Sequence, residues 1–99
     1  MNTIDLTLLE AGEKPYTVTT LHDEAWGKEI AIVFMAGAVM PSHKAPGPVH
    51  IAPVSGVMEI AVGEERIPLK PGKVLCLESG VSHDVRAVET GVLRVTLFK

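Results

Sequence analysis

Hydrophobic residues recur at every second position through most of the chain, and this spacing predicts β-strands rather than helices. Turn residues such as Pro71-Gly72 and Ser79-Gly80 separate the hydrophobic runs. We expect about eight to ten short strands. Nine can be placed from the pattern, at residues 4–9, 16–21, 28–35, 49–54, 57–62, 66–69, 73–77, 82–88 and 92–98.

Many short strands separated by Gly and Pro turns predict an all-β fold in one domain over residues 1–99. A jelly-roll barrel is the expected form, because curling the sheets protects their strand edges. Pro53 lies inside one predicted strand and has no N–H for a central ladder. We therefore expect that position at an edge or a bulge.

The composition points to a second copy of the chain as a partner. Hydrophobic residues make up 46% of the sequence, and the mean hydropathy is +0.28. A small barrel has little interior in which to bury so much apolar surface. We therefore expect a homodimer that covers the surplus.

The charge distribution argues against nucleic acid and membrane partners. The net charge is −3, and no window concentrates the Lys and Arg residues that phosphate binding requires. No hydrophobic run approaches the length of a membrane span, and the first residues lack the regions of a signal peptide. The single cysteine, Cys76, fits a cytoplasmic location, and we expect its thiol to be buried as a small hydrophobe.

Two spaced motifs, G-x5-H-x12-G and G-x7-G-x2-H, carry the candidate chemistry. Their six defining positions are Gly37, His43, Gly56, Gly72, Gly80 and His83. The pair resembles the two signatures of the cupin superfamily, G-x5-H-x-H-x3-4-E-x6-G and G-x5-P-x-G-x2-H-x3-N. This resemblance covers most of residues 29–98 and implies a small single-domain barrel of the cupin type.

The same resemblance implies a divalent metal ion inside the barrel, of which the sequence retains two ligands, His43 and His83. Four motif positions carry other residues. The second histidine is replaced by Ala45, the glutamate by Val49, the proline by Glu78 and the final asparagine by Ala87. Two imidazoles alone would hold an ion weakly.

His50 is the candidate for a third metal ligand, because it stands one residue after the glutamate position. On a regular strand this offset turns the side chain to the opposite face of the sheet. A bulge caused by Pro46-Gly47-Pro48 or by Pro53 would return it to the pocket. The other interpretation is an exposed or dimer-facing strand residue.

Three further residues are candidates for the wall of a ligand pocket. Met35 and Met58 would supply adaptable apolar surface, or they are plain core residues. Glu78 stands five residues before His83 and would orient it, act as a base or complete an ion site, or it is a solvated turn residue. No residue can be given a catalytic role from the sequence.

The sequence leaves three hypotheses for function. The first is a small barrel that binds a small organic ligand, with a divalent ion held by His43 and His83. If it is an enzyme, the resemblance implies oxygenase, isomerase or lyase chemistry. The second is a metal-free ligand-binding or sensing module without catalytic activity. The third is a dimeric barrel with no ligand.

Overall fold

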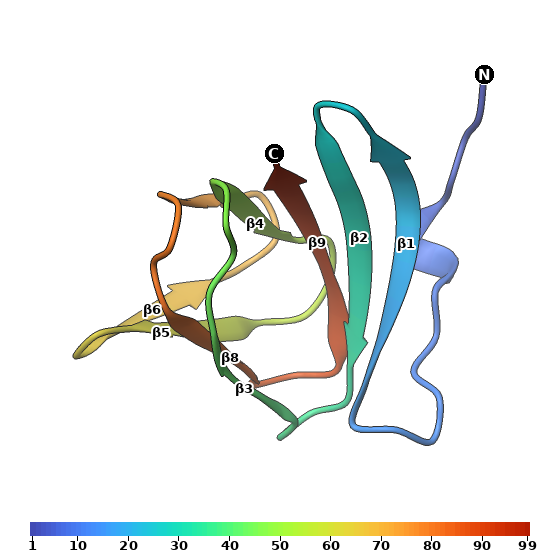
Figure 1. Ribbon diagram of the computed structural model, residues 1–99. Coiled ribbons are helices and arrows are strands. Elements are labelled where there is room, and N and C mark those ends of the chain that lie inside the picture. The colour runs from blue at the N-terminus through green and yellow to red at the C-terminus, as the bar shows by residue number, and fades with distance from the viewer.

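Nine strands and one helical turn make up the computed structural model, which describes residues 1–99 (Figure 1). The strands are β1 (Tyr16–Glu24), β2 (Gly27–Phe34), β3 (Val39–His43), β4 (Val49–Pro53), β5 (Met58–Val62), β6 (Glu65–Leu69), β7 (Leu75–Leu77), β8 (His83–Ala87) and β9 (Gly91–Phe98). The predicted all-β architecture of eight to ten short strands is confirmed. The structure contains no helix with the length and hydrophobicity needed to cross a lipid bilayer.

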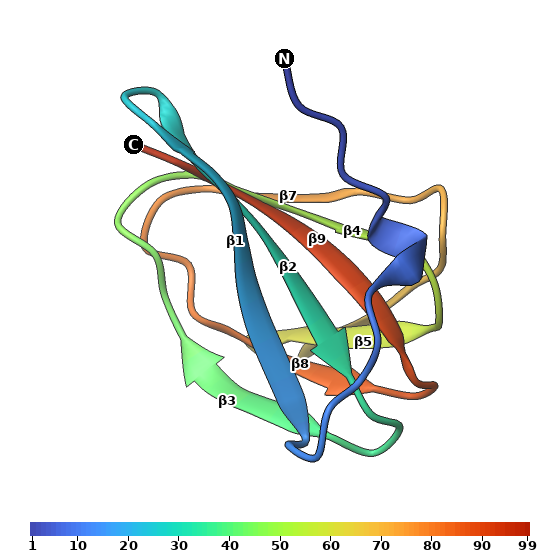
Figure 2. The same ribbon diagram turned by 90° about the vertical axis from the view of Figure 1, so that its right-hand side faces the viewer.

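The strands form two antiparallel sheets packed face to face. The larger sheet has the order β1-β2-β9-β4-β7, and the smaller one has the order β3-β8-β5-β6. Strands far apart in the sequence are therefore neighbours, so that β9 lies between β2 and β4. Figure 2 looks onto the outer face of the larger sheet. This interleaving of distant strands is the topology of a jelly roll.

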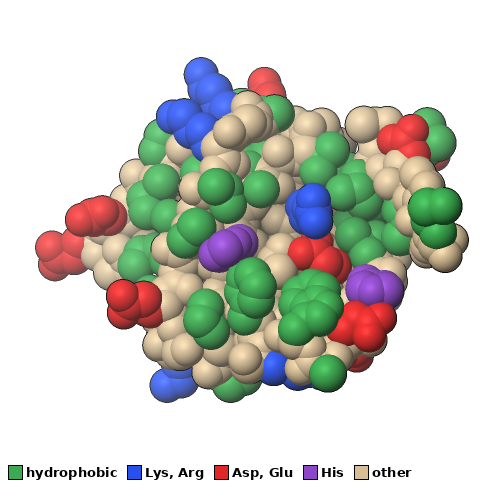
Figure 3. Space-filling model, turned by 90° about the horizontal axis from the view of Figure 1, so that it is seen from above, with side chains coloured by type: hydrophobic (Ala, Val, Ile, Leu, Met, Phe, Trp, Pro, Cys, Tyr) green, Lys and Arg blue, Asp and Glu red, His purple; other side chains and the backbone are tan.

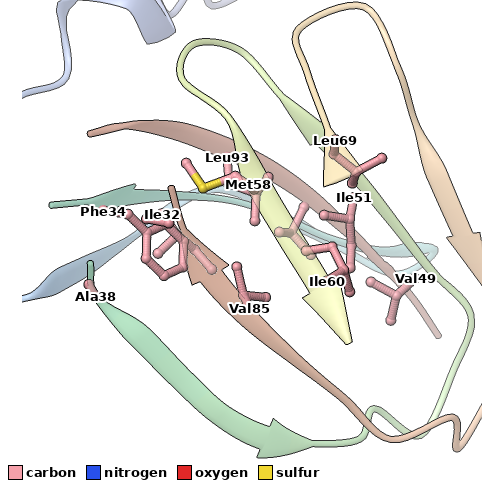
Figure 4. Packing of buried hydrophobic residues seen from close by; sticks show 12 residues of the cluster. Ile32, Phe34, Ala38, Val49, Ile51, Met58, Ile60, Leu69, Val85 and Leu93 are labelled. Carbon is pink, nitrogen blue, oxygen red and sulfur yellow. The ribbon is translucent and has the colours of Figure 1, made fainter. Parts of the chain in front are cut away.

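Alternate residues of both sheets point inward and form the core (Figure 4). The larger sheet contributes Ile32, Phe34 and Leu93, and the smaller sheet contributes Ile60 and Val85. Each of these side chains is less than 5% exposed. Because burial of apolar surface stabilises a fold by about 25 cal/mol per Å², this inner layer is the main source of stability.

The N-terminal residues do not form the strand expected at residues 4–9. They form a 3-10 turn, η1 (Leu6–Leu8), whose N-terminus is capped by Asp5 through a 3.0 Å hydrogen bond from the Thr7 N–H. Leu6 of η1 and the following Leu9 and Ala11 pack on three buried residues of the larger sheet's outer face: Ala31, Val33 and Val92. The prediction was wrong because the apolar residues of this segment cover a sheet face instead of pairing with a sheet edge.

Strand β3 is the element that the hydrophobic pattern missed. Four of its five residues are exposed, so the strand has no alternation of buried and exposed positions. It pairs with β8 at an edge of the smaller sheet, and the register shifts between Met40 and His43. Pro53 lies at the end of β4, where it pairs with Leu93 of β9 and has no partner in β7.

Candidate functional site

A cavity of about 340 Å³ lies between the two sheets. Fifteen residues line it, and eleven of them are hydrophobic, so the interior is apolar. Its walls come from β1, β2, β4 and β9 on one side and from β3 and β8 on the other. Residues 44–46 follow β3 and also line the cavity; together with Gly47 we call them the rim segment.

His43 and His83 are brought together in this cavity. They are direct cross-strand partners of β3 and β8, and their ring centroids lie 4.4 Å apart. His83 is buried, at 4% exposure, whereas His43 is exposed at the edge of the sheet. The two imidazoles therefore form one group, with an inner member and an outer member.

Each ring is oriented by a hydrogen bond to the backbone two residues before it. His43 Nδ1 lies 2.9 Å from the Pro41 carbonyl oxygen, and His83 Nδ1 lies 3.1 Å from the Val81 carbonyl oxygen. Because a carbonyl oxygen only accepts, these contacts assign the proton to Nδ1 in both rings. In a neutral ring the lone pair is then on Nε2, where it is free to accept a proton, a hydrogen bond or a metal ion.

Burial is the main cause that lowers the pKa of the His83 imidazole below its ordinary value. The Val81 carbonyl opposes this lowering, because it accepts a hydrogen bond from the ring. A positive charge on His43 would lower the pKa of His83 further. The Asp84 carboxylate raises the pKa, but more weakly than burial lowers it. His83 therefore keeps its neutral form, with a free Nε2 lone pair, at neutral pH.

The three other residues predicted for the ligand pocket do not line the cavity. Met58 is fully buried in the core and leaves no surface for a ligand. Met35 follows the end of β2 and is 42% exposed. Glu78 is an exposed residue just after β7 and is not among the residues that line the cavity. Periodicity alone could not separate core positions from cavity positions on the same strand face.

His50 lies on the outer face of the larger sheet. Strand β4 pairs with β9 in regular register, so the bulge that would return His50 to the cavity is absent. The His50 ring packs edge-on against Phe98, with a centroid distance of 4.8 Å. Its cross-strand partner in β7 is Cys76, which is exposed. The prediction of a buried thiol was wrong, because β7 is an edge strand whose outer face has no cover.

The sequence pattern did not predict that the rim segment forms part of the cavity wall. Lys44, Ala45 and Pro46 line both the cavity and a neighbouring surface hollow. Gly47 fixes the segment against β9, because a Cβ atom there would lie 1.9 Å from the Phe98 carbonyl oxygen. A side chain at this position would force the backbone apart, so only glycine permits the close approach.

A larger hollow of about 480 Å³ lies outside the barrel, between the N-terminal segment and the outer face of the larger sheet. Its notable residue is Glu29, a carboxylate whose side chain is only 12% exposed. That carboxylate accepts hydrogen bonds from Arg94 Nε at 2.7 Å and from the Thr96 hydroxyl. Since its oxygens already have partners, this group contributes to the fold rather than to a ligand site.

Comparison with known proteins places the chain in a family. A family model for the cupin domain matches residues 31–98. The chain is a cupin. A search of the curated proteins found no match.

Several solved structures share this fold over nearly the whole chain. An RmlC-like cupin protein from Desulfovibrio desulfuricans has a TM-score of 0.89 and 25% identity, covering 99% of this chain and 96% of that chain. A cupin superfamily protein from Desulfitobacterium hafniense has a TM-score of 0.85 and 19% identity, covering 100% and 94%. A conserved protein of unknown function from Streptococcus pyogenes has a TM-score of 0.83 and 22% identity, covering 99% and 88%.

The residues of this cupin do not fit a tightly held divalent ion. Ala45 and Val49 stand where the family motif has a histidine and a glutamate, and both line the cavity with apolar surface. The structure contains no group of three or more His, Cys, Asp or Glu side chains that could hold an ion. His43 and His83 therefore supply two ligands where stable sites use at least three protein ligands.

Proposed function

We propose that this cupin is a metal-free binding module that takes a small, mainly apolar organic molecule into the cavity between its sheets. The observation that carries the proposal is the make-up of the cavity wall, which has eleven hydrophobic residues and, as polar side chains, the imidazoles of His43 and His83 and the amine of Lys44. A volume of about 340 Å³ is within the range of small-molecule sites.

The ligand would be held by two kinds of contact. The apolar walls would supply most of the affinity by removing hydrophobic surface from water. With Nδ1 held by a backbone carbonyl, an imidazole of His43 or His83 in its neutral form would accept a hydrogen bond at Nε2 and so fix the orientation of a ligand hydroxyl or N–H group. No carboxylate, thiol or hydroxyl side chain lines the cavity, so binding is better supported than covalent catalysis.

A screen of small acids, phenols and alcohols by thermal shift tests this proposal, because a ligand that prefers the folded state raises its stability. Ala45→Trp would block the cavity at its rim, whereas Ala36→Trp adds the same side chain at an exposed turn outside it. Compounds that raise the melting temperature should do so in the parent and in Ala36→Trp but not in Ala45→Trp. Equal shifts in all three proteins, or no shift by any compound, would contradict the proposal.

A divalent ion is the second candidate occupant, and the orientation of the two rings favours it. Metal-ligating histidines usually donate their second ring N–H to a fixed acceptor, as His43 and His83 do. Metal analysis of untagged protein decides between the two candidates. We expect substoichiometric metal that His43→Ala and His83→Ala leave unchanged. Near-stoichiometric metal that both substitutions remove would overturn the metal-free proposal.

We also propose that the cupin forms a homodimer through exposed apolar surface. Figure 3 shows hydrophobic side chains gathered around a histidine on the face seen from above. Trp26 is 48% exposed and lies beside Phe98, with ring centroids 6.1 Å apart. Large exposed apolar surface of this kind is common where a second subunit binds.

A further inference from the structure

Positively charged side chains surround the rim of the cavity. Two shallow surface hollows adjoin the cavity, and both share Ala45 and Pro46 of the rim segment with it. Among all residues that line these three spaces, the charged ones are Lys28, Lys44 and Lys99. No aspartate or glutamate lines any of them.

Two of these lysines form no salt bridge. Lys99 forms a salt bridge with Asp23 at 3.3 Å, but Lys28 and Lys44 form none. Lys28 shares the inward-facing parity of Ile30 on β2; its cross-strand partners are Leu97 on β9 and Asp23 on β1, and Asp23 is the acid that already pairs with Lys99. The chain has twelve acidic and nine basic residues, so a rim lined by three lysines and by no acidic residue runs against its overall charge.

The position of these charges restricts the ligand that the cavity can accept. An apolar wall has a low dielectric and strengthens the field of nearby lysines, which attracts anions. The Nδ1–H groups of His43 and His83 point at backbone carbonyl oxygens, so they are not available to bind an anionic group inside the cavity. A negative charge is therefore favoured at the rim, with the apolar part of the same molecule inside.

We infer that the cavity selects small organic carboxylates, with the apolar body between the sheets and the carboxylate at the rim beside Lys28 and Lys44. This inference rests on the proposed function and names the class of ligand. Its elements are an apolar interior, two imidazoles next to it and a rim lined by lysines and by no acidic residue.

Isothermal titration calorimetry with three compounds of one carbon skeleton tests the inference: 3-phenylpropanoate, 3-phenylpropanol and 3-phenylpropylamine. The protein is treated with a chelator, so that a bond between carboxylate and metal cannot supply the preference. We expect the carboxylate to bind about tenfold more tightly than the alcohol, because one charge-assisted hydrogen bond contributes about that factor to the affinity. We expect the amine to bind most weakly.

The variant K28M/K44M should lower the affinity for 3-phenylpropanoate about tenfold and leave the affinity for the alcohol within about twofold. The control K70M/K73M removes the same number of charges from the exposed turn between β6 and β7, and it should change neither. Equal binding of alcohol and carboxylate, or equal effects of both variants, would overturn the inference and leave the binding module standing. Binding of none of the three compounds would overturn both.

Discussion

Leu93 tests whether the cavity wall is packed as described. This side chain is fully buried, and it belongs both to the core and to the lining of the cavity. Leu93→Ala removes three carbon atoms, which costs about 2.5 kcal/mol at about 0.8 kcal/mol for each buried group. The void that is left adds to this cost, and Leu→Ala substitutions at buried sites span about 2 to 5 kcal/mol. We therefore expect a loss of about 3 kcal/mol.

Urea denaturation at one fixed protein concentration measures this loss, because the stability of the proposed dimer would depend on concentration. The matched control is Leu8→Ala, the same chemical change at a side chain that is 74% exposed. It should cost less than about 0.5 kcal/mol. A loss below about 1 kcal/mol for Leu93→Ala, or equal losses for both variants, would refute the packing of the two sheets around this residue.

Three further outcomes follow from the structure. Burial lowers the pKa of His83, so the unfolded chain takes up the proton first, and stability should fall as the pH falls below about 6.5. The parent should lose more stability than His83→Gln between pH 7 and pH 5.5, and parallel curves would contradict the assignment. The exposed Cys76 thiol should react with a disulfide reagent in native protein as fast as in urea, and strong protection would contradict its exposure. Sedimentation equilibrium should give the mass of two chains, and Trp26→Glu should lower it; a monomeric parent would refute the dimer.

Strands with one buried and one exposed face were predictable from the sequence. Strand β4 and strand β8 each bury every second residue, so their period-two pattern matches their environment. Strand β3 could not be recognised in this way, because edge position and exposure remove the constraint on its side chains. Residues 4–9 were predicted to form a strand because their apolar residues are spaced like those of a strand. In the structure these apolar residues cover the outer face of the larger sheet instead.

The only parts of the site that could be predicted were those in which a motif residue occupies a defined position on a strand. The motif spacing predicted that His43 and His83 share a site, although forty residues separate them, because the family fold pairs β3 with β8. Parity along β4 predicted the outward face of His50 if the strand was regular, as it is. The positive rim has no local signature, since Lys28 and Lys44 come from separate elements and line two adjoining spaces that share Ala45 and Pro46.

The two apolar replacements in the first motif explain both the missing metal ligands and the positive rim. Val49 is 2% exposed and lines the cavity, so a glutamate there would place a carboxylate beside His43 and His83. It would also bring a negative charge toward Lys44, which lines the same cavity. Val49 therefore has two effects. It removes a possible ion ligand, and it leaves the rim without a nearby negative charge.

The double variant A45H/V49E restores the family ligands at both positions and reverses this change. Without metal we expect lower stability than the parent, because a buried carboxylate without a partner is costly. Zinc should then raise the melting temperature of the variant by binding three imidazoles and one carboxylate, while the parent responds weakly. Adding His83→Ala should reduce this response, and the variant should lose the preference for 3-phenylpropanoate over the alcohol. If zinc stabilises the double variant no more than the parent, then the imidazoles of His43 and His83 do not face the positions of Ala45 and Val49, and the geometry on which both proposals depend is refuted.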